Sequence, residues 1–284
     1  MQRDSADGGG VLYVVATPLG NLEDITLRAL RVLKEATLIA CEDTRHTQKL
    51  LNHYGITART VSYYEQNEAA RAGQLLEELQ KGARIALVSD AGMPGISDPG
   101  FRLISTAIEH GIAVVPVPGA SALVAAVAAS GLPTDSFRFG GFLPAKAGQR
   151  RQALEEIRDS ACTEIFYEAP HRVKDTLEDV AAILGDERRV VVAREITKVH
   201  EEFLRGTVRE VLEALKARSE VKGEITLLIG AGEMGDIQPP MDPQKRLQEI
   251  MAEEKIDQKT ALKKLAREMG ISKSEAYRML QRNK

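Results

Sequence analysis

The residues best suited to chemistry gather in short segments that directly follow apolar runs. The longest of these segments is SDAGMPGISDPG, residues 89–100, which holds three glycines, two prolines and two aspartates after the run ARIALV. Glycine lets a ligand approach the backbone closely, and proline fixes the shape of a loop. This composition favours a ligand-binding platform. The alternative is a rigid turn in which Ser97 or Asp98 caps the following helix.

A second segment of this kind, CEDTRH, spans residues 41–46. It brings together charged and ionisable side chains that could bind a polar substrate: Glu42, Asp43, Arg45 and His46. The alternative is an ordinary helix start with Asp43 or Thr44 as its cap. The first apolar run leads into ATPLGN, residues 16–21, which lacks the GxGxxG pattern of a dinucleotide-binding turn. The sequence therefore disfavours a classical nucleotide-cofactor domain.

Three more segments place polar groups at the ends of expected strands. PGASA, residues 118–122, opens a helix, and the backbone N–H groups of a helix N-terminus bind anions. FYEAPHR, residues 166–172, and AREITKVHEE, residues 193–202, both end in dense charge. These last two segments indicate either facing ligand sites or a solvated network of ion pairs.

The segments above are separated by alternating strand-like and helix-like stretches. In the first half we expect strands at 11–17, 37–43, 60–64, 83–90 and 113–118, with helices at 22–36, 45–55, 68–82 and 98–111. Regular alternation of this kind, with glycine closing the helices, predicts an α/β domain with a largely parallel sheet. Because ligands bind beyond the carboxyl ends of such strands, the polar segments are expected to meet there.

After a small-residue helix at 118–133, strand-like runs become more closely spaced. We expect strands at 136–144, 163–170, 188–197, 201–206 and 224–231, with helices at 149–160, 172–184 and 207–217. This predicts a second α/β unit with a mixed sheet. The predicted division is a disordered leader at 1–10, an N-terminal α/β domain at 11–118, a C-terminal α/β domain at 119–232, a linker at 233–243 and a helical tail domain at 244–284.

Composition bounds the possible partners and compartment. The net charge of the 284 residues is −3, so the chain as a whole gives no electrostatic argument for nucleic acid, although residues 241–284 are net basic. The two cysteines, Cys41 and Cys162, indicate buried reduced thiols and no zinc site. No apolar run is long enough to cross a membrane. We expect a soluble cytoplasmic protein with no metal, membrane or DNA partner.

The tail carries a pattern of its own. Two helices are expected around MGIS, residues 269–272, as in a helix-turn-helix, and Ser272 with Glu275 predicts a capping box. Lysines and arginines, among them Lys263 and Lys264, make the tail positive. The tail is expected either to contact an RNA backbone or to pack on the body or on a partner subunit.

Taken in order, the motifs resemble one family. They are TPLGNLEDITLRA, CEDTRHTQKLL, SDAGMPGISDPG, PGASALVAAVAASGLP, GFLP, FYEAPHR, AREITK and KGEITLLI. Together they are similar to the tetrapyrrole-methylase superfamily, over about residues 11–230, and within it to the branch that modifies ribosomal RNA. The resemblance implies two α/β domains with S-adenosylmethionine in the cleft between them, a helix-turn-helix-like appendage, and a homodimer.

The resemblance also implies an activity and a cofactor site. The expected reaction is 2'-O-methylation of the ribose of a cytidine in 16S ribosomal RNA, on the free RNA or on the 30S subunit. The alternative is methylation of a tetrapyrrole precursor or another small molecule. Residues matched to cofactor-contacting positions are Pro18, Leu19, Asp90, Ala91, Gly92, Ser97, Ser121, Ala122, Tyr167, Ala193 and Thr226.

Transfer to a hydroxyl is helped by a positioned base. The candidates are Glu195, Lys198, Asp43 and Glu168, of which the Glu195/Lys198 pair is favoured because a carboxylate beside a cation can hold and polarise a ribose hydroxyl. Candidates for contact with RNA are Arg45, His46, Arg172, Arg194, Lys263 and Lys264. A non-enzymatic nucleic-acid-binding regulator is disfavoured, because the long body of strand-end loops exceeds what a scaffold needs.

Overall fold

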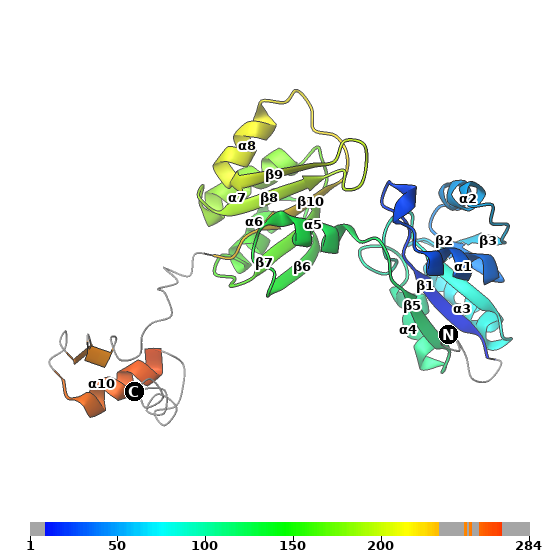
Figure 1. Cartoon of the computed structure of the whole chain (residues 1–284), viewed down its shortest axis with the longest axis horizontal. Coiled ribbons are helices and arrows are strands. Elements are labelled where there is room, and N and C mark those ends of the chain that lie inside the picture. Colours follow the sequence, from blue (N-terminus) through cyan, green and yellow to red (C-terminus); the bar gives the residue numbers. More distant parts are fainter. Residues whose placement is uncertain (1–8, 233–246, 249, 252–255, 269–284) are drawn as a thin grey trace. The chain divides into compact units, whose positions relative to one another are not determined.

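The computed structural model describes residues 9–232, 247–248, 250–251 and 256–268 (Figure 1). It divides into two compact units, residues 1–232 and 233–284. Most of the predicted leader, the predicted linker, and the second predicted tail helix with Ser272 and Glu275 lie outside the described residues. The predicted boundary between residues 118 and 119 falls inside the first unit and stays a prediction.

The first sheet is parallel throughout, with strand order β3-β2-β4-β1-β5. Its strands are β1 (Val11–Val15), β2 (Leu38–Cys41), β3 (Thr60–Ser62), β4 (Arg84–Val88) and β5 (Ala113–Val117). The apolar, β-branched residues of β1 and β4 are buried on both faces, as a central parallel strand requires. This confirms the predicted parallel α/β sheet.

Helices cover both faces of this sheet. Its helices are α1 (Leu27–Glu35), α2 (Thr44–His53), α3 (Glu68–Gln80) and α4 (Phe101–Glu109). The buried residues of α1 and α2 pack in one apolar cluster with β1, and those of α3 and α4 pack in another on the opposite face. Because helices cover both faces of the sheet, the loops that follow the strands lie outside the two helical layers.

One predicted helix of this half is shorter than expected. The stretch 22–36 forms a single 3-10 turn at Leu22–Asp24, and α1 begins only at Leu27. The reason is Thr26, whose side chain accepts a hydrogen bond from the Ala29 N–H (3.1 Å) and caps α1. The segment before α1 is a loop, and its Leu19, Gly20 and Asn21 contact the second half of the unit.

The second sheet is mixed, with strand order β6-β7-β10-β8-β9. Its strands are β6 (Phe137–Phe142), β7 (Thr163–Glu168), β8 (Arg189–Arg194), β9 (Glu202–Thr207) and β10 (Ile225–Ile229). Only β6 and β7 pair in parallel; the other pairs are antiparallel. The predicted mixed sheet is confirmed.

The helices of this sheet are α5 (Ala122–Ser130), α6 (Ala147–Glu156), α7 (Val173–Leu184) and α8 (Val208–Lys216). Residues of α6, α7 and α8 fill the larger apolar cluster on one face. On the other face, α5 packs its small side chains against β7, β8 and β10, and Leu19 joins that cluster from the first half of the chain. The two halves thus share a packed contact within the first unit.

In the second unit, α10 spans Gln258–Glu268. Its Ala261, Leu262 and Leu265 form a small apolar cluster with Leu247 and Ile250. Lys263 and Lys264 lie on the exposed side of α10. Among the described residues, no helix is both long and apolar enough to cross a bilayer. Both cysteines are free thiols; Cys41 is buried as predicted, whereas Cys162 is only partly buried.

Candidate functional site

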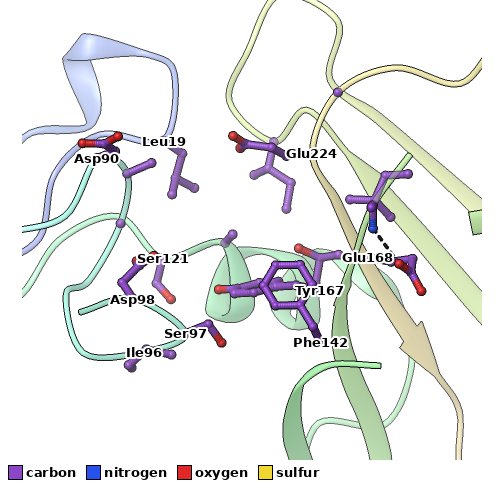
Figure 2. A pocket seen from close by; sticks show the side chains of 18 of the residues that line it. Leu19, Asp90, Ile96, Ser97, Asp98, Ser121, Phe142, Tyr167, Glu168 and Glu224 are labelled. Carbon is purple, nitrogen blue, oxygen red and sulfur yellow. Dashed lines mark hydrogen bonds between the residues drawn. The ribbon is translucent and has the colours of Figure 1, made fainter. Parts of the chain in front are cut away.

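A cavity of about 370 Å³ lies in the first unit. Loops that follow β1 and β4 form one side of it, and α5, β6, β7 and the start of β10 form the other (Figure 2). The carboxyl ends of β1 and β4 thus face the cavity, which is where parallel sheets bind ligands. Its volume is in the range of small-molecule and cofactor sites.

The loop 89–100 is pinned to the end of β1. Thr17 and Gly92 exchange two backbone hydrogen bonds, each 2.9 Å long, and the Thr17 hydroxyl donates to the Ser89 carbonyl (3.1 Å). Gly92 adopts a φ of +81°, which glycine tolerates without strain. The glycine-rich composition therefore serves a tight, fixed loop that carries several cavity-lining residues: Asp90, Ala91, Gly92, Met93, Ile96, Ser97 and Asp98.

The alternative capping role of Ser97 and Asp98 is wrong. Helix α4 begins at Phe101 with Gly100 as its N-cap and without a side-chain cap. Ser97 instead has a φ of +59°, a conformation that is uncommon for a residue other than glycine. Both side chains are thereby turned toward the cavity, where Figure 2 shows Asp98 beside Ser121.

The opposite wall comes from α5, β6 and β7. Ser121 caps α5 as predicted, accepting a hydrogen bond from the Val124 N–H at 3.5 Å. Phe142 reaches the cavity through a register shift in β6, where Gly141 has a φ of +68°. Its ring meets the Tyr167 ring edge-on, with centroids 5.6 Å apart. The wall therefore combines two aromatic rings with the open N-terminus of a helix.

The third part of the lining is the segment that enters β10, which sequence reasoning covered only at Thr226. Gly223, Glu224 and Ile225 line the cavity there. Gly223 has a φ of +89°, and a Cβ at this position would lie 2.3 Å from the Glu195 Cγ. The sequence does show a glycine, Gly223, just before an apolar strand, but its spacing from the other motifs does not predict that it lies at the cavity.

The ionisable groups of the cavity are mostly acidic. Asp98 is partly buried, and this burial, reinforced by the neighbouring Glu42 carboxylate, raises the pKa of Asp98 to about 6 even though a hydrogen bond with Ser89 opposes the change. Burial, followed by the charge of Asp98, also raises the pKa of the Tyr167 hydroxyl. Asp98 was not among the predicted site residues, because in the sequence it reads equally well as a helix cap.

Glu168 lines the cavity, but its carboxylate is fully engaged. The Arg172 guanidinium donates to its Oε1 (2.6 Å), as does the Ala169 N–H (2.6 Å), and the Thr176 hydroxyl donates to its Oε2 (2.7 Å). The side chain of Glu168 is 0% exposed. This geometry describes a structural ion pair, and it also occupies Arg172, which was predicted to hold a phosphate.

The predicted Glu195/Lys198 pair forms at the cavity rim. The Lys198 ammonium lies 2.9 Å from the Glu195 Oε1 and 3.1 Å from the Glu224 Oε2. The hydrogen bond from Lys198 lowers the pKa of Glu195. Burial acts to lower the pKa of Lys198, but its hydrogen bonds to Glu195 and Glu224 outweigh burial and raise that pKa. Glu195 and Lys198 do not line the cavity themselves; Glu224 connects them to it.

This rim is also where the two halves of the first unit touch. The stem of Lys198 packs so closely on Gly20 that a Cβ there would lie 2.2 Å from the Lys198 Cγ. The Asn21 N–H donates to the Thr197 hydroxyl (3.3 Å). Glu195 and Thr197 have φ values of +54° and +65°. Non-glycine residues in this region store strain, which is common at functional sites.

The other predicted site residues lie outside the cavity. Asp43 caps α2, accepting a hydrogen bond from the Arg45 N–H (2.8 Å), and its own N–H donates to the Asp90 Oδ1 (3.1 Å). The side chain of Arg45 is 89% exposed, and His46 is exposed beside it. Arg194 is held by Glu202 at 3.1 Å. Arg45 and His46 are presented to solvent, and so in part is Asp43, whose side chain is 41% exposed.

The predicted cofactor-contacting residues divide clearly. Nine of them line the cavity: Leu19, Asp90, Ala91, Gly92, Ser97, Ser121, Ala122, Tyr167 and Thr226. Pro18 and Ala193 are buried and do not line it; Ala193 pairs with Thr226 in the sheet and packs in the core beneath α5. Within the described part of the chain, no cluster of three His, Cys, Asp or Glu side chains suited to a metal ion is found.

Methyltransferases of known structure share this fold of two linked α/β halves. The methyltransferase CobJ superposes with a TM-score of 0.60 at 20% identity, covering 81% of this chain and 98% of that one. Uroporphyrin-III C-methyltransferase from Thermus thermophilus, complexed with S-adenosylhomocysteine, gives a TM-score of 0.55 at 21% identity over 78% and 97% of the two chains. At these identities the likeness shows the fold alone.

The family follows from the sequence comparisons. The family model for Tetrapyrrole (Corrin/Porphyrin) Methylases matches residues 11–212, and the chain belongs to this family. "Ribosomal RNA small subunit methyltransferase I" of Halalkalibacterium halodurans is 50% identical over 95% of this chain and 94% of its own length. The protein of the same name from Escherichia coli O157:H7 is 46% identical over 98% and 97%.

Proposed function

We propose that the protein is an S-adenosylmethionine-dependent methyltransferase that acts on the 16S ribosomal RNA of the small subunit. The observation that carries this is the match, at 45–50% identity over about 95% of the chain, to several relatives named small subunit rRNA methyltransferases. The acceptor within the RNA is the ribose 2'-oxygen of cytidine 1402. This acceptor rests on the resemblance of the motifs to the RNA-modifying branch of the family.

The cavity fits the cofactor by its chemistry. S-adenosylmethionine combines a flat, stackable base, a sulfonium with a fixed positive charge, and a polar, zwitterionic amino acid end. Leu19, Ile96 and Phe142 supply apolar surface, and Asp90 and Asp98 supply negative charge. Serine and tyrosine hydroxyls complete the lining. When bound, this cofactor supplies a methyl group on a sulfonium, which is already activated for transfer.

The protein's part of the reaction is then mainly positioning. The pinned loop 89–100 fixes one wall, and the strained turn at residues 195–197 holds Glu195 against Lys198 at the rim. Holding two reactants in line can supply a large share of the rate enhancement. Lys198 orients the ribose hydroxyl at the rim, with Glu195 and Glu224 fixing its ammonium. Because Glu195 has a lowered pKa, its part is to hold the cation more than to remove a proton.

The role of Lys198 is tested by Lys198→Ala. Turnover should fall by on the order of 10²-fold while cofactor affinity stays within about twofold of the parent. The matched control is Lys222→Ala, which removes a lysine that pairs with Glu220 on an exposed surface. Loss of cofactor binding in Lys198→Ala would instead place Lys198 in the cofactor site.

The function as a whole is tested by transfer of a labelled methyl group. Small ribosomal subunits that lack their modifications, the free 16S RNA and a porphyrin precursor are each offered with labelled S-adenosylmethionine. Label that enters the RNA at one position and protects it from alkaline cleavage identifies a 2'-O-methyltransferase. Label in the porphyrin precursor alone would move the protein to the tetrapyrrole branch and refute the proposal.

The protein acts as a homodimer. Apolar side chains remain exposed on α4 and on the edge strand β6, with Phe101 76%, Ile108 60% and Phe142 57% accessible. Pairing of two chains at these elements would cover Phe142, which also lines the cavity. Sedimentation of the parent and of Phe101→Ser tests this. We expect a dimer that the substitution weakens; a monomeric parent would refute it.

A further inference from the structure

The cavity carries negative charge that nearby cations balance only in part. Its ionisable lining residues, apart from Tyr167, are Asp90, Asp98, Glu168 and Glu224, and no lysine, arginine or histidine is among the described residues that line it. Glu168 is neutralised by Arg172 at 2.6 Å. Glu224 pairs with Lys198, but its side chain is highly exposed, and Lys198 also pairs with Glu195. Asp90 and Asp98 are in no ion pair within the described part of the chain.

Asp98 lies where these charges converge. Glu42 approaches it from the end of β2, Asp90 from the end of β4 and Glu224 from the start of β10, and all three disfavour its ionisation. From β7, Tyr167 turns its ring into the same cavity (Figure 2). A hydrogen bond with Ser89 acts in the opposite direction and favours the ionised carboxylate. A cation placed in this cavity would therefore gain from several carboxylates at once.

The donor and the product of methyl transfer differ by one such charge. S-adenosylmethionine carries a fixed sulfonium, whereas S-adenosylhomocysteine is a neutral thioether with otherwise the same groups. We propose that the carboxylates of Asp98 and Asp90 make the cavity discriminate between the two, favouring the cationic donor and releasing the neutral product. This inference rests on the proposed cofactor, but not on the identity of the methyl acceptor.

The expected size of the effect follows from Coulomb's law. Unit charges a few ångströms apart, in the effective dielectric of a partly buried site, change an equilibrium by on the order of tenfold or more. The sulfonium has no proton to lose, and the amino acid end is common to both ligands. A difference in affinity that depends on Asp98 therefore reports the sulfonium and not the shared ammonium.

The test is calorimetric titration of the full chain with each ligand alone, without RNA. In Asp98→Asn, which keeps the size and hydrogen-bonding shape of the side chain, S-adenosylmethionine affinity should fall by about tenfold and S-adenosylhomocysteine affinity by less than about twofold. Asp186→Asn is the matched control, because Asp186 is exposed in the loop before β8, at the end of that strand away from the cavity. Equal losses for both ligands in Asp98→Asn would overturn the proposal.

The parent protein provides a second measurement that needs no substitution. Because Asp98 titrates at about pH 6, the preference for the donor over the product should shrink as the pH is lowered from 8 to 5. Glu42, whose pKa is also raised by burial and then by Asp90, contributes in the same direction. A preference that is constant over this range would overturn the proposal even if Asp98→Asn did not fold.

The two proposals fail in different ways. If the parent binds neither ligand, the cofactor assignment itself is wrong. If it binds the donor with a pH-dependent preference but transfers no methyl group to RNA, the charge discrimination stands and the RNA substrate falls. If it methylates RNA but binds both ligands alike at every pH, the discrimination falls alone.

Discussion

The Glu168 carboxylate lies on the cavity wall, yet both of its oxygens are used by neighbouring groups. Arg172, Thr176 and the Ala169 N–H hold it, and its side chain is fully buried. The Oε1 atom accepts the bonds from Arg172 and Ala169, and the Oε2 atom accepts the bond from Thr176. Its chemistry is therefore structural: it joins the end of β7 to the start of α7, so that the strand's last residues keep their place in the wall.

Removing Glu168 should destabilise the fold more than it affects chemistry. In Glu168→Ala the Arg172 guanidinium loses its buried partner, which costs about 3–5 kcal/mol of unfolding free energy. Glu168→Gln keeps the shape and should cost less. Urea unfolding measures both. If Glu168→Gln unfolded like the parent and bound cofactor normally but lost turnover by several orders of magnitude, Glu168 would be the base after all.

At the scale of single residues, the sequence predicted the ligand-facing loop at residues 89–100 better than it predicted which side chains line the cavity. The density of glycine and proline in residues 89–100 identified the cavity loop correctly. It could not decide between Asp98 as a cap and Asp98 as a cavity group, because that depends on Gly100 capping α4. Gly223 and Glu224 were missed because their place in the wall arises from sheet pairing between β10 and β8, which no local pattern encodes.

At the scale of elements, the turn after β8 depends on a glycine in a different segment. Gly223 leaves space for the Glu195 side chain, whose Oε1 accepts a hydrogen bond from the Glu224 N–H (3.0 Å). The sequence predicts a strand that extends to residue 197. The structure ends β8 at Arg194, because Glu195 and Thr197 adopt positive φ values that no strand accommodates.

Gly223→Ala should therefore disturb the rim. Alanine at a φ of +89° is strained, and its Cβ would lie 2.3 Å from the Glu195 Cγ. We expect a loss of stability of about 2–3 kcal/mol and a fall in turnover as Glu195 leaves Lys198. Gly185→Ala is a close control, because Gly185 has a φ of +92° but no atom within 4 Å of the added Cβ. Equal effects from the two variants would show that only backbone strain matters.

A separate network fixes the β8–β9 hairpin. Both Glu202 oxygens accept hydrogen bonds from Arg218, at 2.5 and 2.7 Å, and Arg194 donates to the Oε2 at 3.1 Å. These bonds, those from Arg218 first, lower the pKa of Glu202 from 4.5 to about 2. Arg194, predicted to hold RNA, is therefore bound within this network, which links the hairpin to the segment that follows α8.

The Glu202 network predicts a pH dependence of stability. Because the folded-state pKa is lower than the ordinary value, the contribution is complete above about pH 4.5 and is lost as the pH falls toward 2. Glu202→Gln should lower the urea midpoint at pH 7, and the difference from the parent should shrink between pH 4.5 and 3. Glu187→Gln, which removes an exposed carboxylate, should show little effect at any pH. A difference independent of pH would contradict this assignment.

At the scale of the whole molecule, the chain separates an acidic catalytic body from a basic tail. The order of motifs predicted the two-sheet body, because each β-α step leaves a local signature. The tail's role was not predictable in the same way, since its apolar cluster of Leu247, Ile250, Ala261, Leu262 and Leu265 suits a packing element as well as an RNA-binding one. What distinguishes the two roles is the use made of the lysines on the exposed side of α10.

If the tail holds RNA, Lys263→Ala/Lys264→Ala should weaken binding to the small-subunit RNA in a salt-dependent way. Each lysine that no longer neutralises a phosphate lowers the slope of log K against log salt by about 0.7–0.9, so the double variant should lower that slope by up to about 1.8. The same pair of changes at Lys49 and Lys81, which are exposed on the first unit, serves as the control. A tail that only packs against protein would leave the slope unchanged in the α10 variant. A body that binds RNA through its own surface would show the smaller slope in the control instead, because counterion release counts only the cations that face phosphate.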